Sequence, residues 1–539
     1  MLAAGCSAVL LAPATTEAAA EIPSVFASEV ARFTRLAGSA SDDLRIEAAQ
    51  GFGWLKHPSG ETPLLPLAKA ESPVVRLTAT KALGVCGGRR TVPVLIERLG
   101  DSEWEIRRAA HDALRRMTGQ TLPADARDAW GKWLEGSDWQ AKEGKLLGQL
   151  KKGDRAARLR ALRALRFVGS SRAEVAVLAV LAKPGDLGGD GVKAAIQALE
   201  RIGTAKALPL LAPHAVRWPG TAWTLGQVGG PKAEEILLKA FRKFGTRTLD
   251  VMVNLDRVES TRCAEFLPTL LRAFGLVIYR SRPDELHRPP DAVQRTAANL
   301  ILRTGQAPRL VDLVLAEVEG KRKNADTPPP LRKLLAGMRH ELKRGFVRSD
   351  GMTVAQPLAA LPHIATDKRF VPRLVALLDH RAYLVRIYVA MTLAALKAES
   401  AVPKILKVVR EPYPFVDAAT QASGKHFGRS QTVRWRGYLC IALGRLGGEP
   451  ARAALEALAG DPTSFRDIRY GSVVGLKFLG SPKSVAVLER VAEQDIIWAI
   501  QREAEEAVAE IRLGEGNAQL ADDNPVACNV NDKDSGLFF

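Results

Sequence analysis

Residues 72–119 read SPVVRLTATKALGVCGGRRTVPVLIERLGDSEWEIRRAAHDALRRMTG. Arg76 is followed at positions +3, +6 and +7 by two alanines and a leucine, and the same pattern follows Arg107. Arg45, 31 residues before Arg76, begins another copy. These offsets place small and apolar residues on one face of a helix, and a fixed period of this length is typical of a solenoid. The sequence therefore predicts an all-α protein, an α-solenoid built as a superhelix of stacked antiparallel helix pairs.

An Arg that opens the inner helix after an Asp or Ser-Pro turn resembles the HEAT-repeat family, in particular its short bacterial, phycobilin-lyase-like form. The resemblance implies that the Arg and Asp residues are structural and link adjacent repeats across the turn. A second, local resemblance lies at 114–139, where Leu-Arg-Arg-Met-Thr-Gly-Gln precedes Asp125 and a Trp130-x-x-Trp133 pair. This segment is similar to one in bacterial extracytoplasmic HEAT-repeat proteins. The positions given the structural role are Arg45, Arg76, Asp101, Arg107, Arg158, Arg386, Arg436 and Arg469.

The repeat pattern divides the chain into two arrays. We expect an N-terminal array over 22–320 and a C-terminal array over 332–513, separated by a Pro-rich hinge at 321–331, since three consecutive prolines cannot lie inside a helix. The Trp-bearing segment at about 118–141 is an insertion into the first array. Its Trp130 and Trp133 lie three residues apart, so they either cap the end of a helix stack or form an exposed platform for a ligand.

The net charge is +18, with 77 Lys and Arg against 59 Asp and Glu. Residues 142–172 hold ten basic and two acidic residues, and residues 331–410 hold fifteen basic and five acidic residues. Lys151, Lys152 and Arg155 are candidate partner-binding residues in the first of these segments. The charge suits nucleic acid, an anionic membrane surface or an anionic envelope polymer, and the alternative is an ordinary solvated helix face.

The N-terminal residues 1–20 are apolar and end in three alanines before Glu21. This pattern predicts a secretory signal peptide with a cleavage site after Ala20; the usual basic start is absent, so we expect the true start to lie upstream. The run is too short to be a transmembrane helix. Cys6 lies in a sequence that resembles a lipobox, which would make the protein a lipoprotein. We expect a periplasmic or otherwise extracytoplasmic location, with a cytoplasmic location as the alternative.

The longest irregular segment within the arrays lies at about 410–433. A long loop in a tight array is either disordered or functional, and this one carries aromatic and basic residues. The candidate partner-binding residues are Tyr413, Phe415, His426, Phe427 and Arg429; packing of the aromatic rings on a neighbouring repeat is the alternative. Residues 514–539 are rich in Asn, Asp and Gly and predict a disordered tail.

The sequence contains no nucleophile elbow and no phosphate-binding loop. Five scattered cysteines argue against a zinc site, so we expect no metal or cofactor. The resulting hypothesis is a non-enzymatic scaffold that binds protein partners, whose identity the sequence does not give, outside the cytoplasm. The alternative is a cytoplasmic nucleic-acid-binding protein that uses segments 142–172 and 331–410. A third alternative is a HEAT-like lyase or glycosylase. It is the weakest of the three, because similarity of the repeats alone does not establish an activity.

Overall fold

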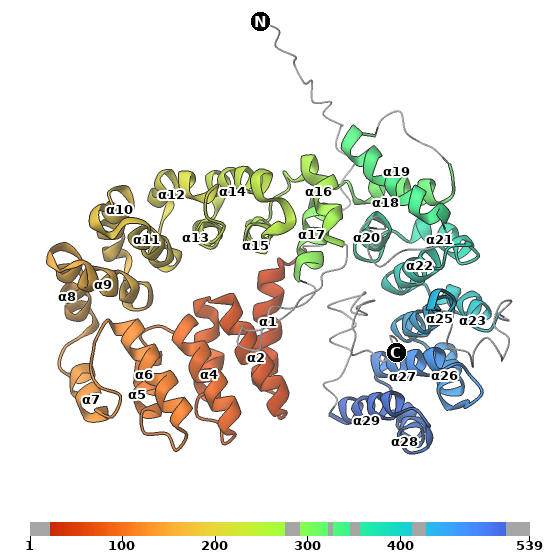
Figure 1. Cartoon of the computed structure of the whole chain (residues 1–539), viewed down its shortest axis with the longest axis horizontal. Coiled ribbons are helices and arrows are strands. Elements are labelled where there is room, and N and C mark those ends of the chain that lie inside the picture. The colour runs from red at the N-terminus through yellow and green to blue at the C-terminus, as the bar shows by residue number, and fades with distance from the viewer. Residues whose placement is uncertain (1–21, 275–291, 322–326, 345–355, 412–426, 514–539) are drawn as a thin grey trace, which may run out of the picture.

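The computed structural model describes residues 22–274, 292–321, 327–344, 356–411 and 427–513. Within these ranges the chain forms α-helices joined by turns and short 3-10 segments, and contains no β-strand. Consecutive helices pair, and the pairs stack side by side in two curved rows (Figure 1). The protein is therefore an all-α solenoid, as the 31-residue pattern predicts.

The inner helix of each pair carries the repeated pattern, and the outer helices pack against one side of it. In α6 (Trp104–Thr118) the residues Ala110, Ala113 and Leu114 are fully buried, and Gly119 ends the helix with φ = 71°. Alanines at these positions let neighbouring inner helices approach closely, so the core runs continuously from repeat to repeat.

The N-terminal array begins with α1 (Val25–Ala37) and holds α7 (Arg127–Glu135) in its predicted insertion. Its inner helices, besides α6, are α2 (Asp42–Leu55), α4 (Pro73–Cys86), α9 (Arg155–Val168), α11 (Gly188–Ile202), α13 (Thr221–Val228), α15 (Leu249–Arg257) and α17 (Ala292–Arg303). Its outer helices are α3 (Glu61–Leu67), α5 (Thr91–Arg98), α8 (Trp139–Lys152), α10 (Glu174–Ala182), α12 (Leu208–Ala215), α14 (Gly230–Phe244), α16 (Leu267–Leu271) and α18 (Ala307–Val318).

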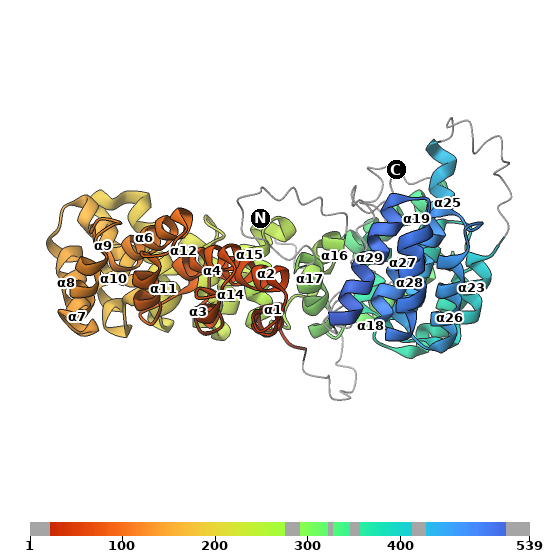
Figure 2. The same ribbon diagram turned by 90° about the horizontal axis from the view of Figure 1, so that it is seen from below.

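The C-terminal array continues the stack from α17 and α18. Its inner helices are α20 (Gln356–Ile364), α22 (Tyr383–Ala395), α25 (Phe427–Leu446), α27 (Arg466–Leu479) and α29 (Trp498–Leu513). The others are α19 (Pro329–Arg344), α21 (Val371–Leu377), α23 (Val402–Val409), α26 (Glu449–Gly460) and α28 (Val485–Gln494). Figure 2 shows the two arrays side by side, the N-terminal array on the left and the C-terminal array on the right.

Two boundaries differ from those that the sequence predicts. Pro329 and Pro330 form the first turn of α19, where a missing amide hydrogen costs no hydrogen bond. α25 begins at Phe427, so the predicted loop at 410–433 is wrong in its last seven residues. Residues 429–436 are Arg-rich and contain neither Gly nor Pro, which is compatible with a helix, and the weak repeat pattern there concealed it.

The inner helices α25 and α27 pack unusually closely. A Cβ atom added to Gly444 would lie 2.0 Å from the carbonyl oxygen of Gly475, and one added to Gly471 would lie 2.3 Å from that of Gly437. Because real Cβ atoms do not approach backbone oxygens so closely, these glycines are required by contact between the helix backbones and not by chain flexibility.

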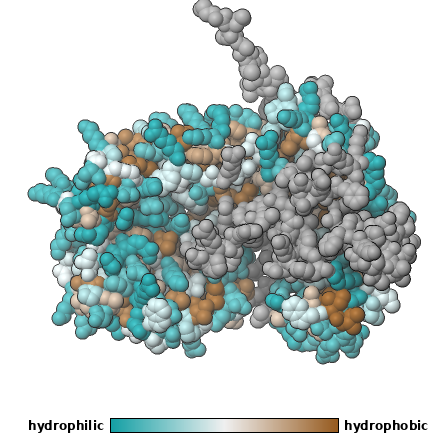
Figure 3. Space-filling view, in the orientation of Figure 1, coloured by the Kyte–Doolittle hydropathy of each residue, from teal (hydrophilic) through white to brown (hydrophobic). Residues whose placement is uncertain are grey.

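The first helix does not form a free end of the solenoid. α1 packs against its neighbour α2 and also against α15 and α17, which lie more than 200 residues further along the chain (Figures 1 and 2). The inner helices from α1 to α15 therefore close into a loop. On the face seen in Figure 3, the described surface is mainly hydrophilic, with small hydrophobic patches.

Candidate interaction surfaces

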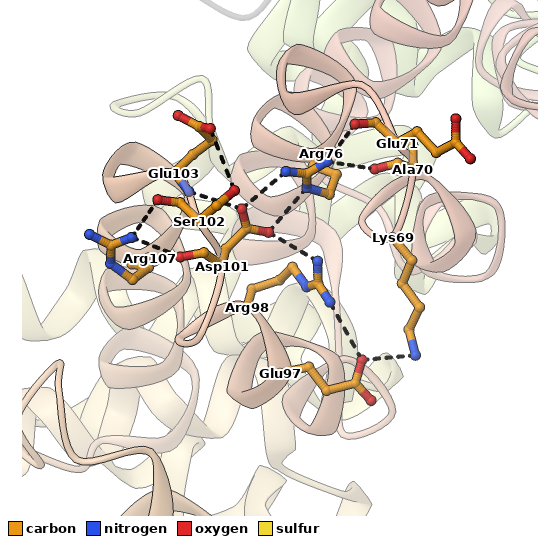
Figure 4. A network of polar contacts seen from close by, with 10 residues as sticks. All are labelled: Lys69, Ala70, Glu71, Arg76, Glu97, Arg98, Asp101, Ser102, Glu103 and Arg107. Atoms are coloured by element: carbon orange, nitrogen blue, oxygen red, sulfur yellow. Dashed lines mark hydrogen bonds and ion pairs between the residues drawn. The ribbon is translucent and has the colours of Figure 1, made fainter.

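The repeated arginines link neighbouring repeats. Arg76 donates from Nε and Nη2 to the two carboxylate oxygens of Asp101, both at 3.1 Å, and from Nη1 to the carbonyl oxygens of Ala70 and Glu71 (Figure 4). Asp101 also accepts from Arg98 at 3.0 Å and is almost fully buried. Burial alone would raise the pKa of Asp101, but the hydrogen bonds and positive charges around it hold that pKa below its usual value.

The same arrangement recurs at the far end of the chain. Arg469 donates to the carboxylate of Asp495 at 2.8 and 3.1 Å and to the carbonyl oxygen of Ser464. Arg107 donates to the carbonyl oxygens of Asp101 and Ser102, at 2.7 and 2.8 Å. The remaining anchors bind the turn or the next repeat: Arg45 pairs with Asp42, Arg158 with Asp186, and Arg386 with Glu411, while Arg436 donates to the carbonyl oxygens of Val409 and Glu411. These groups are engaged within the protein.

A buried polar cluster, which we call the clasp, closes the N-terminal loop of helices. Asp256 at the end of α15 is fully buried and accepts a 2.6 Å hydrogen bond from the backbone amide of Val25, the first residue of α1. It pairs with Arg303 of α17, which also donates to the carbonyl oxygen of Ile22 at 2.8 Å. Burial raises the pKa of Asp256, against the opposing effect of Arg303. Glu29 of α1, also fully buried, pairs with Arg295 of α17.

The inner side of the helices differs between the two arrays. Successive residues of an α-helix are 100° apart around its axis. The fifth residue after each repeated Arg therefore lies on the side of the helix opposite to the residues at +3 and +7, which pack on the outer helices. In the N-terminal array these positions are polar and exposed: Lys81, Asp112, Arg163 and, in α11, Gln197. In the C-terminal array they are apolar: Met391 and Ile441, each 1 % exposed, and the half-buried Val474.

Four exposed cations, which we call the inner cationic row, follow this side of α4, α6, α9 and α11: Lys81, Arg108, Arg163 and Lys193. No described carboxylate pairs with Lys81, Arg108 or Arg163, and Lys193 lies 5.8 Å from the ring centre of Trp218. Charge counts along the sequence do not reveal this row, but positions +1 and +5 compared across successive repeats would have found it.

The basic segment of residues 142–172 does not form a single surface. Arg155 is half exposed but donates to Asp190 at 3.0 Å and to the carbonyl oxygen of Asp186. Arg158 and Arg166 also form ion pairs, with Asp186 and Glu200. Lys151 and Lys152 are exposed, but they lie at the end of the outer helix α8, away from the inner cationic row.

The Trp residues of the insertion pack within the protein. Trp130 is fully buried, and its Nε1 donates to the carbonyl oxygen of Pro123 at 3.0 Å. Trp133 and Trp139 lie edge to face, with Lys142 Nζ 5.1 and 5.5 Å from their ring centres. The protein's own lysine therefore occupies the aromatic platform, and the geometry matches a cap on the helix stack.

The residues predicted for the long loop lie largely outside the described part of the chain. This applies to Tyr413, Phe415 and His426. Phe427 and Arg429 belong to the first turn of α25, but their side chains also lie outside the described residues. The assignment of these five residues to partner binding remains a prediction.

A pocket of about 410 Å³ lies at the C-terminal ends of α20, α22 and α25. Its polar lining includes His363, Lys368, Lys397 and Arg445, with no carboxylate. Burial and the charge of Arg445 lower the pKa of His363 to about 3, so its ring is neutral at pH 7. A pocket of this composition favours an anionic group.

The described ranges lack two further features, a cluster of metal ligands and a membrane-spanning helix. No group of three or more His, Cys, Asp or Glu residues there could hold a metal ion. No helix in those ranges is long and apolar enough to span a membrane. Cys86 and Cys440 are fully buried, and burial raises the pKa of each thiol to about 12, so neither is a reactive thiolate.

Comparison with known proteins finds a similarity over the first repeats. Residues 30–115, which run from within α1 to within α6, match the family described as HEAT repeats. No curated protein matches the sequence. Among solved structures, one match comes from a structure described as a phosphorylation switch that controls the interaction between cadherin and beta-catenin. That chain is 12 % identical, and the match covers 89 % of this chain and 100 % of that one, with a TM-score of 0.20.

Proposed function

We propose that this HEAT-repeat protein is a non-enzymatic scaffold that binds an acidic segment of a protein partner outside the cytoplasm. The inner cationic row carries the proposal. It places four exposed cations on successive helices of one side, three of them without a described carboxylate partner. The same side also carries Asp112, so the surface is mainly but not purely cationic. Positive charge repeated along successive helices suits an extended acidic partner better than a compact ligand.

The closed N-terminal loop favours a narrow partner. Arg201 of α11 donates to the carbonyl oxygens of Gly87 and Cys86 at the end of α4, at 2.7 and 2.5 Å. At the C-terminal ends of α4 and α11, the single side chain of Arg201 therefore bridges the two sides of the loop. A chain segment fits beside the row more readily than a folded domain or a duplex.

The alternative, nucleic-acid binding in the cytoplasm, depends on segments 142–172 and 331–410. Many cations of these segments are paired within the protein: Arg155 with Asp190, Arg373 with Glu319 and Asp312, and Lys404 with Asp379. Breaking such pairs to bind phosphate would offset part of the electrostatic gain. The location outside the cytoplasm rests on the apolar N-terminal stretch of the sequence alone.

Site-specific photo-crosslinking in cells tests both parts. p-Benzoylphenylalanine replaces Gln197, beside the inner cationic row, and in a matched control replaces Val175, which is 71 % exposed on the outer helix α10. We expect adducts with an acidic protein segment from position 197 only, in the extracytoplasmic fraction, with the mature chain starting near Glu21. Nucleic-acid adducts in the cytoplasm, equal adducts from both positions, or no adduct would refute the proposal.

A charge-reversal variant tests the row directly. Lys81→Glu, Arg108→Glu and Arg163→Glu together should weaken partner binding roughly tenfold or more, because each reversal adds repulsion as well as removing attraction. Reversal of Lys151, Lys152 and Arg172, which are equally exposed but lie near outer helices, is the control and should change binding by less than about twofold.

A further inference from the structure

The C-terminal ends of several inner helices meet at one end of the N-terminal loop. Figure 1 shows α4, α6, α9 and α11 curving round the left of this array. Arg201 of α11 donates to the carbonyl oxygens of Cys86 and Gly87 at the end of α4, at 2.5 and 2.7 Å. Arg89, which follows α4, donates to the carbonyl oxygen of Val168, the last residue of α9, at 2.9 Å. The space between these helices is therefore narrow at this end, which we call the closed end.

Arg116 lies on the inner side of α6 at the closed end. It follows Asp112 by four residues, so the two lie on the same side of the helix. A Cβ atom added to Gly84 of α4 would lie 3.1 Å from Nη2 of Arg116, so the guanidinium rests against the neighbouring inner helix. Arg116 is exposed, and no described carboxylate or carbonyl oxygen pairs with its guanidinium. A ligand that enters the loop can therefore reach this group.

Two further arginines lie near Arg116, but both are engaged within the protein. Arg166 of α9 pairs with Glu200 at 3.1 Å, and Arg201 caps the end of α4. Loss of water around Arg116 lowers its pKa, Arg166 adds to this effect, and the charge of Asp112 opposes it. Burial likewise lowers the pKa of Arg201 to about 10, again with a contribution from Arg166. Arg166 thus repels a guanidinium on each side of it, and a bound anion would relieve that repulsion.

Hydrogen-bond donors at the closed end remain unused. The Nε atoms of Arg166 and Arg201 are buried without a hydrogen-bond partner among the described residues. Glu61, whose charge acts on Arg201, already accepts from the backbone amide of Gly88 at 3.0 Å and from the hydroxyl of Thr91 at 2.9 Å. A carboxylate is the ligand that this surplus of donors favours, because it offers lone pairs together with negative charge and matches the planar guanidinium of an arginine.

We propose that Arg116 binds one carboxylate group of the partner's acidic segment and so fixes how far that segment enters the loop. The inference rests on the proposed function, since it assigns the end of the same surface. Arg163 and Lys81, each one helical turn further from the closed end, contact the rest of the segment. The segment cannot continue past the closed end, because Arg201 bridges α11 and α4 there. The carboxylate is therefore that of the segment's last residue or of an acidic side chain close to it.

Binding of a labelled peptide to the purified full-length protein tests the proposal. Fluorescence anisotropy measures the dissociation constant of hexaglutamate that carries fluorescein at its N-terminus. Arg116→Gln should weaken binding roughly tenfold or more, because a charge-assisted hydrogen bond is lost. Arg115→Gln is the matched control. It removes the same charge from the adjacent exposed residue, which lies 100° further round the helix, and it should change binding by less than about twofold.

Thermal unfolding separates binding from a structural role. Because Arg116 has no described partner and is repelled by Arg166, Arg116→Gln should leave the melting temperature unchanged or raise it. Arg116→Lys keeps the charge but loses the planar group, so it should recover only part of the affinity. A lower melting temperature of Arg116→Gln would show that Arg116 holds the helices together, and it would overturn the proposal.

The peptide also identifies which carboxylate is bound. If amidation of its last carboxylate removes the effect of Arg116→Gln, the terminal carboxylate is the ligand; if the effect remains, a side chain is. Equal weakening by the Arg115 and Arg116 variants, or no binding of hexaglutamate by the wild-type protein, would overturn the proposal.

The charge-reversal variant of Lys81, Arg108 and Arg163 separates this proposal from the proposed function. If that variant loses binding while Arg116→Gln does not, the role of Arg116 is refuted and the inner cationic row stands. If Arg116→Gln loses binding while the charge-reversal variant does not, the role of Arg116 stands and the inner cationic row is refuted.

Discussion

Replacing Asp256 with Asn should release α1 from the helices that hold it 231 residues further along the chain. Asn keeps the size of the side chain and an oxygen for the amide of Val25, but it removes the negative charge. Arg303, whose side chain is 8 % exposed, would then be a buried cation without its ion-pair partner. Loss of one member of a buried pair typically costs about 3–5 kcal/mol.

Hydrogen exchange measured by mass spectrometry reports this loss of stability separately for each helix. At about 1.4 kcal/mol per factor of ten, a loss of about 3 kcal/mol should speed exchange of the amides in residues 25–37 by roughly a hundredfold. Exchange in α28 and α29 should not change, because those helices pack on each other and on α26 and α27, at the other end of the chain.

Two variants sharpen the test. Asp190→Asn removes a carboxylate whose pair with Arg155 is more than half exposed on both sides, and it should cost less than about 1 kcal/mol. Asp256→Asn combined with Arg303→Met removes both charges and should recover much of the loss. Unchanged exchange in α1, or an equal rise in every helix, would refute the view that the clasp holds the loop closed.

Three further outcomes follow from single residues. Asp101→Asn should destabilise the N-terminal array by about 3 kcal/mol in urea unfolding, because it leaves Arg76 without its carboxylate. Lowering the pH from 7 to 5 should reduce the free energy of unfolding by about 2 kcal/mol through His57, because burial lowers its folded pKa to about 4 while the unfolded chain takes up a proton below about 6.5. His57→Gln should remove that part of the pH dependence of stability, and an unchanged pH profile in the variant would contradict the prediction. Gly444→Ala should destabilise the protein by about 3 kcal/mol, because the added Cβ would meet the backbone of α27. Gly144→Ala in α8, where the surrounding space is open, should instead stabilise the protein by about 0.5–1 kcal/mol. Thermal unfolding should show a lower melting temperature for the first variant and a higher one for the second.

The repeat period was enough to predict the class of fold. Offsets from Arg76 and Arg107 define the buried face of a helix, and α4 and α6 appear where that pattern begins. Local patterns of this kind depend only on residues within one or two turns. The end of the long loop was harder to predict, because nothing in the residues that precede Arg436 repeats the pattern that marks the other inner helices.

The surfaces were less predictable than the helices. Charge counts along residues 142–172 suggested a basic binding surface, but Arg155 pairs with Asp190 and Arg158 with Asp186 in the next repeat. Which cation meets which carboxylate depends on how repeats stack, and composition does not contain that information. The clasp was undetectable for the same reason, since Asp256 and Val25 are far apart in sequence.

The clasp also sets the order in which the protein can be assembled. Most contacts in a repeat array join neighbours, so each pair of helices can form as soon as it leaves the ribosome or a translocation channel. α1 is the exception, because its partners in α15 and α17 do not yet exist when it emerges. Closing a segment of over 200 residues also carries a larger entropic cost than pairing adjacent helices. The first helix to be synthesised is therefore among the last to reach its final place, and until Arg303 has emerged the N-terminal array is an open chain of repeats that a chaperone or a partner can enter.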